Sequence, residues 1–166
     1  MSAPDMWISQ AGAMLTAILA GVAALQTAIP GRSAAWALLP LPSLLVWVGA
    51  STAGCIRLAP IVGAEPEPAM HVMVCAQFVV LVSVPLCALL VWLLMRACPL
   101  RPGLTATLGG LASAAAAATL LAPIHPFDAT AADLLVHAVA IVLVVLLTRL
   151  AAARALGRQN NTRGIR

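Results

Sequence analysis

The chain alternates between long uncharged stretches and short polar segments. Asp, Glu, Lys and Arg are absent from residues 6–31, 33–56, 68–95, 103–127 and 134–148. A bilayer core about 30 Å thick needs roughly 20 apolar helical residues to cross it. The pattern therefore predicts an all-α, polytopic membrane bundle of about five transmembrane helices, at residues 7–29, 34–55, 72–95, 104–123 and 131–152. These spans form one integral membrane domain, residues 1–152, followed by a basic tail at residues 153–166.

Three prolines near the start of the second span modify this prediction. Residues 30–33 (PGRS) are expected to form a turn, and the span begins after them. Pro40 and Pro42 then fall a turn or two into the helix. Because proline lacks a backbone N–H, the two residues should bend the helix or delay its regular start.

Composition places the chain in lipid rather than water. Hydrophobic residues make up 63% of the chain and charged residues 8%, whereas soluble domains contain about 25% charged residues. No phosphate-binding loop, pair of intramembrane carboxylates or nucleophile–base motif is present in the sequence. We therefore expect no catalytic residues and no enzymatic activity.

Nine arginines and no lysine set the expected orientation. Cytoplasmic segments of membrane proteins are enriched in basic residues. A cytoplasmic C-terminus and an outward N-terminus place every arginine except Arg57 inside, with Arg32, Arg96, Arg101 and Arg149 as topology anchors. The net charge of +4 is then explained by contact with anionic lipid, and direct nucleic acid binding is not expected.

Small residues recur in the fourth span. Gly109 with Ser113, and Gly110 with Ala114, each have the small-xxx-small spacing that lets helices approach closely in lipid. This pattern predicts a central position for the span in the bundle. The alternative is that it reflects only an alanine-rich composition.

Polar groups with metal or redox chemistry gather near the predicted outward ends. Cys55 and Cys75 bracket one outer loop, where an oxidising compartment favours a disulfide. Thiolate and imidazole also suit soft or borderline metals, so Cys55, Cys75, His71 and His125 are alternatively a metal site at the outward face. Two buried thiols without a chemical role are the third alternative, and no cofactor follows firmly from the sequence.

His137 is the one histidine deep in a predicted span. It lies four residues after Asp133, so one helix face can present both side chains. Ionisable groups at this depth are costly and mark candidate functional sites. A transport pathway through His137 and Asp133, and a histidine that only hydrogen-bonds within the bundle, both remain open.

Two longer stretches carry distinctive motifs. Residues 30–55 contain PGRS-x-x-W-ALLPLP and the pair Gly54-Cys55, and residues 93–138 contain R-x-x-PLRPGLT, a Gly-Gly helix and HP-x-D. In these motifs the chain resembles the NrsF family of bacterial membrane anti-sigma factors over nearly its whole length. The resemblance implies an inner-membrane protein that holds an extracytoplasmic-function sigma factor inactive on the cytoplasmic side until stress. It also implies that the outward cysteines, here Cys55 and Cys75, sense metals or oxidants.

The chain departs from the family at its beginning. Family members typically start one span earlier, with a cytoplasmic segment implicated in sigma binding, so we expect an N-terminally shortened member. The alternatives are a shortened member without anti-sigma activity, a small transporter or channel subunit, and an inert scaffold.

Overall fold

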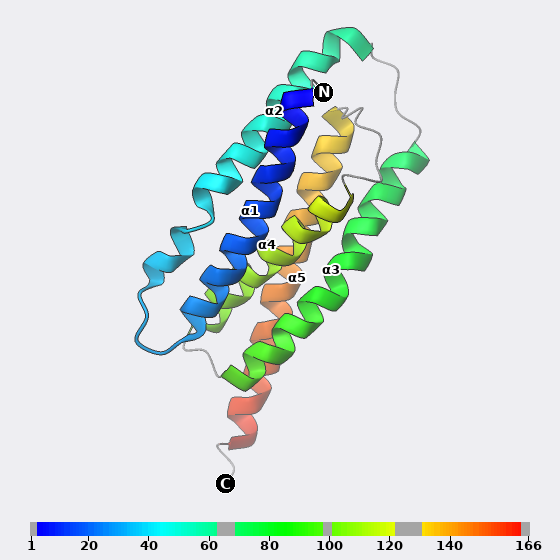
Figure 1. The fold of residues 1–166 in the computed structure, drawn as a ribbon. Helices are drawn as coiled ribbons and strands as arrows, with labels where there is room; N and C mark the ends of the chain where they lie inside the picture. Colours follow the sequence, from blue (N-terminus) through cyan, green and yellow to red (C-terminus); the bar gives the residue numbers. More distant parts are fainter. Residues whose placement is uncertain (1–2, 63–68, 98–100, 122–130, 164–166) are drawn as a thin grey trace.

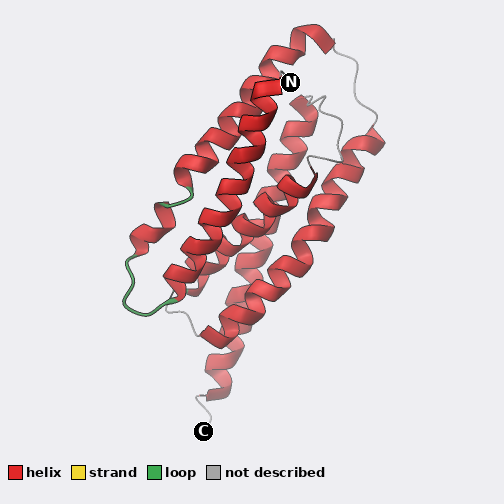
Figure 2. Cartoon of the chain, viewed as in Figure 1, coloured by secondary structure: helices red, strands yellow, loops and turns green. Residues whose placement is uncertain are grey.

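The computed structural model describes residues 3–62, 69–97, 101–121 and 131–163. Within these ranges the chain forms helices and no strands, so the all-α prediction is confirmed (Figure 2). The elements in chain order are α1 (Ala3–Ala28), the short 3-10 helix η1 (Ala34–Leu38), α2 (Leu41–Val62), α3 (Ala69–Ala97), α4 (Pro102–Leu121) and α5 (Ala131–Arg163).

The five α-helices run alternately up and down along one bundle axis (Figure 1). α4 packs against α1, α3 and α5, α3 also packs on α5, and α2 lies at the periphery, mainly on α1. The helix richest in glycine and alanine is therefore central, as its small-residue spacing predicted. Glycine and alanine have little or no side chain, so three neighbouring helices can approach the backbone of α4 closely at the same time.

Four stretches are long and apolar enough to cross a membrane: Met6–Ala28, Ala34–Arg57, Pro102–Leu121 and Leu134–Ala152. In α3 the described apolar stretch is Val80–Leu90. Large apolar side chains such as Leu45 and Leu81, each 71% exposed, cover the outside of the bundle. The largest fully buried side chains described are only Thr16, Thr105, Pro40 and Ser83. Small residues inside and large apolar residues outside are what a lipid solvent favours.

The entry to the second span has a boundary set by its prolines. The turn before it uses Gly31 at a φ of +83°, a conformation that glycine adopts without steric cost. Ser33 then caps η1 by accepting a hydrogen bond from the backbone N–H of Ala35. The regular helix α2 begins only at Leu41. Pro42 then lies in the first turn, where a missing N–H costs nothing. The expected delay of the helix start is confirmed.

Two glycines bring helix pairs into backbone contact. A Cβ atom on Gly12 of α1 would lie 3.0 Å from the backbone of Trp47 on α2, and one on Gly110 of α4 would lie 3.0 Å from the Cα of Val145 on α5. Both distances are shorter than ordinary carbon–carbon contacts of about 3.5–4.0 Å. These two positions therefore set the α1–α2 and α4–α5 spacings.

α5 continues past the apolar stretch that predicted it. The apolar span ends at Ala152, whereas the helix continues to Arg163. The end of the apolar pattern therefore predicts where the membrane span ends. It does not predict where the helix ends, because the backbone hydrogen bonds need no apolar side chains. The described part of the basic tail is thus an extension of α5.

Candidate functional site

The two candidate sensor cysteines lie on helices that do not pack together. Cys55, near the C-terminal end of α2, is a free thiol and only 7% exposed. Cys75 lies in the second turn of α3, and its side chain is outside the described part of the chain. α2 and α3 are not among the packed helix pairs of the described residues, and α1, α4 and α5 lie between them (Figure 1). A disulfide needs Cα atoms within about 7 Å, and α2 and α3 do not provide an extended packed interface that would hold the two cysteines together.

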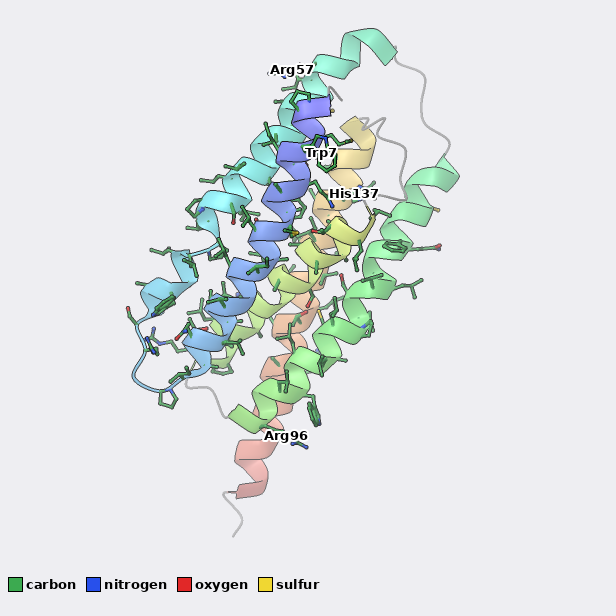
Figure 3. The ribbon with its side chains drawn as sticks, in the orientation of Figure 1. Trp7, Arg57, Arg96 and His137 are labelled. Carbon is green, nitrogen blue, oxygen red and sulfur yellow. The ribbon has the colours of Figure 1, made fainter. Side chains whose placement is uncertain are left out.

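The histidine and aspartate candidates are described only in part. His137 is half-buried in the second turn of α5, facing the bundle end where Trp7 lies (Figure 3). His125 is outside the described residues, as are the side chains of His71 and Asp133. The described residues contain no group of three or more His, Cys, Asp or Glu side chains that could hold a metal ion. The metal site and the transport pathway therefore stay predictions.

Polar side chains connect helices at the end of the bundle that holds Cys55, which we call the cysteine end. The Ser9 and Ser51 hydroxyls lie 2.9 Å apart and link α1 to α2 one turn from Cys55. The Gln10 side-chain amide donates to the backbone carbonyl of Thr119 at 2.9 Å and links α1 to α4. Hydrogen bonds of this kind fasten helices in lipid, each contributing about 1 kcal/mol.

α1 is held by a second set of hydrogen bonds farther along. The Thr16 hydroxyl lies 3.1 Å from the Ser43 hydroxyl of α2, and the Thr27 hydroxyl lies 3.2 Å from that of Thr105 on α4. With the two contacts at the cysteine end, α1 is bonded to α2 and to α4 at two levels each. α1, α2 and α4 therefore form a cross-linked frame.

α3 is attached to its neighbours differently. Among its described side chains, Cys87 joins it to another helix: the Thr148 hydroxyl of α5 donates a hydrogen bond to the Cys87 sulfur at 3.0 Å. One turn away on α3, the Ser83 hydroxyl is fully buried and has no hydrogen-bond partner. Pro85 lies between them inside the helix and removes one backbone hydrogen bond. This segment of α3 therefore combines an unpartnered buried hydroxyl with an interrupted backbone hydrogen-bond pattern.

Described arginines separate to the two ends of the bundle. Arg57 lies at the cysteine end and Arg96 at the opposite end (Figure 3), where the chain order also places Arg32, Arg101, Arg149 and Arg154. We call this the arginine end. The guanidinium of Arg96 lies 4.1 Å from the ring centroid of Trp92, and that of Arg32 lies 6.0 Å from Trp36, both within cation–π range. Arginine paired with tryptophan is typical of a membrane–water interface.

The polar side chains that connect the helices were not predicted from the sequence: Ser9, Gln10, Thr16, Thr27, Ser43, Ser51, Thr105 and Thr148. Their signal was present, because each is a polar side chain inside a long apolar run. The sequence did not show which of these side chains bond to each other between helices, since any of them can bond a carbonyl of its own helix instead. Thr148 does both, with a second contact of 2.7 Å to the carbonyl of Val144.

The described arrangement offers thiol chemistry and polar contacts between helices. Its reactive groups are single thiols on separate helices, and its polar contacts fasten helices to one another. A family model described as NrsF, negative regulator of sigma F, matches residues 1–157. No curated protein and no solved structure matches the chain.

Proposed function

This chain belongs to the NrsF family of negative regulators of sigma F, and from that membership we propose that it is a membrane-embedded anti-sigma factor. It holds an extracytoplasmic-function sigma factor inactive at the arginine end and releases it when a metal or an oxidant acts at the cysteine end. The family match over residues 1–157 is the observation that carries this proposal. The bundle supports it, because helices that cross the membrane can connect a signal on one side to a partner on the other.

The proposed orientation has the arginine end in the cytoplasm of a bacterial inner membrane. Among the described arginines only Arg57 is at the cysteine end. Basic residues favour the cytoplasmic side during insertion. The cysteine end then faces outward, where disulfides form and persist.

α3 is the proposed moving element. Cys75 lies near its start at the cysteine end, and Arg96 lies in its last turn at the arginine end. The described hydrogen bonds cross-link α1, α2 and α4 at several levels, whereas α3 contains the Ser83–Pro85 segment and is bonded through Cys87 to Thr148 of α5. Oxidation of the Cys55 and Cys75 thiols to a disulfide releases two protons and gives two electrons to the oxidant. In this proposal, closing that bond shifts α3 relative to α2, and the shift reaches the arginine end.

Repression of a sigma factor is the direct test. The full chain would be co-expressed in a heterologous bacterium with each extracytoplasmic-function sigma factor of its source, one at a time, beside a promoter reporter. We expect one sigma factor to lose about tenfold in reporter activity, which corresponds to about 1.4 kcal/mol of coupling. Unchanged activity of every sigma factor, with the chain present in the membrane, would contradict the proposal.

Replacing the two sensor candidates separates repression from sensing. A Cys55→Ser, Cys75→Ser double variant should repress the reporter normally and lose its induction by diamide, a thiol oxidant, or by cadmium, because neither sulfur ligand remains. Cys87→Ser is the matched control. Its hydroxyl can still accept the hydrogen bond from Thr148, so induction should persist. Full induction of the double variant would rule out cysteine sensing while leaving repression in place.

A further inference from the structure

The end of α5 projects beyond the rest of the bundle. The apolar span ends at Ala152, and the helix continues for eleven residues to Arg163, a length of roughly 16 Å at 1.5 Å per residue. Figure 1 shows this part of α5 passing the ends of α3 and α4 at the arginine end. We call residues 153–163 the α5 extension.

Charge on the α5 extension has a single sign. It contains Arg154, Arg158 and Arg163, and no acidic residue lies anywhere between residues 134 and 166. Arg154, at its start, is exposed. A basic segment without acidic residues of its own attracts an acidic partner and repels a basic one.

The α5 extension has weak intrinsic support as a helix. Gly157, Asn160, Asn161 and Thr162 are all poor helix formers. A segment of this length that is not covered by other elements is marginal in water. Contact with a partner would add the stabilisation that the extension lacks on its own.

Lipid headgroups form too thin a layer to cover the whole extension. Each headgroup layer extends roughly 5–8 Å beyond the hydrocarbon core. Arg158 and Arg163 lie six and eleven residues past Ala152, or about 9 Å and 16 Å along the helix. A segment that binds a membrane surface lies in the plane of that surface, whereas α5 continues in the direction of its span (Figure 1).

We propose that the α5 extension is a docking element for an acidic surface of the regulated sigma factor. This inference rests on the proposed function and adds to it the part of the chain that holds the partner. The extension is also well placed to respond to the signal. Thr148, which bonds Cys87 on α3, lies on α5 just before it, so a shift of α3 is passed to α5 and redirects the extension.

A charge-removal experiment tests the docking element. The sigma factor that the chain represses in the reporter assay would be titrated onto the full chain in phosphatidylcholine nanodiscs, at low and at physiological salt. In the test variant, glutamine replaces Arg154, Arg158 and Arg163. In the matched control, lysine replaces the same three arginines, so the positive charge of the extension is kept.

We expect the test variant to bind the sigma factor at least about tenfold more weakly and with a smaller dependence on salt, because screening acts on exposed charges. The control should stay within about twofold of the original affinity. A green fluorescent protein fused to the C-terminus should remain fluorescent in both variants, which shows that insertion and orientation are unchanged. Equal binding by the test variant would overturn the docking element and leave the proposed function standing.

Two further outcomes also decide the question. If no sigma factor binds the unmodified chain, the docking element and the proposed function both fail. If a fluorophore at Arg163→Cys reports contact with phosphatidylglycerol nanodiscs, and sigma binding does not depend on the three arginines, the extension is a lipid anchor and the inference is wrong.

Discussion

Gly110→Leu is expected to destabilise the bundle by about 3 kcal/mol, the upper part of the usual range for overpacking. A Cβ atom at this position would lie 3.0 Å from the Cα of Val145 and 3.2 Å from both the Cβ and the hydroxyl of Thr148. Backbone cannot move aside as a flexible side chain can, so α5 has to separate from α4. That separation also strains the Thr148–Cys87 hydrogen bond, which joins α5 to α3.

Thermal unfolding in detergent measures this effect. The midpoint should fall by about 10 °C for a chain of this size. Gly49→Leu is the control, because a Cβ on Gly49 meets no atom within 4 Å and leucine is the better helix former by nearly 1 kcal/mol. Its midpoint should stay constant or rise slightly. An equal fall in both variants would show that glycine removal itself, and not the α4–α5 contact, is responsible.

Gly12→Leu is expected to separate α1 from α2. A Cβ on Gly12 would lie 3.0 Å from the N, Cα and Cβ atoms of Trp47. Gly12 also lies between Ser9 and Thr16, whose hydroxyls contact Ser51 and Ser43 on α2. A leucine at Gly12 therefore pushes α1 away from α2 and breaks the hydrogen bonds at Ser9 and at Thr16.

Disulfide trapping reports this separation directly. In a chain without native cysteines, Ser9→Cys and Ser51→Cys place two sulfurs where hydroxyls lie 2.9 Å apart. Mild oxidation should join them readily, and adding Gly12→Leu should lower the yield about fivefold or more, since disulfide geometry tolerates little displacement. Gly21→Leu on the same helix meets no atom within 4 Å and should leave the yield unchanged. Efficient trapping in the Gly12 variant would contradict the prediction.

Much of the architecture was predictable because the need to satisfy backbone hydrogen bonds in lipid controls it. Absence of charge over a bilayer's width forces a helix, since lipid offers no partner for backbone N–H and C=O groups. The prolines also predicted a bend in the second span or a delayed start, because proline acts through its own covalent structure, and the structure shows the delay, with α2 beginning at Leu41. The central position of α4 was predictable from its small residues, which cannot fill space alone and must be approached by neighbours.

The candidate site was much less predictable. Cys55 and Cys75 bracket one loop in the sequence, yet their helices do not pack together in the described part of the chain. A loop connects only the ends of two helices, and helix packing is decided along their whole length. The Thr148–Cys87 contact joins residues sixty-one positions apart, and nothing local distinguishes Cys87 from a cysteine that only fills space.

The sequence by itself determined the solvent, the number and approximate limits of the helices, and the separation of arginines to one end, because each depends on residues close together along the chain. The tertiary structure alone decided which polar groups meet, which helices form a bonded frame, and that the described hydrogen bonds join α3 to α5 rather than to that frame. These features depend on how helix faces are rotated toward each other, and in lipid that rotation is set by close packing at a few positions such as Gly12 and Gly110.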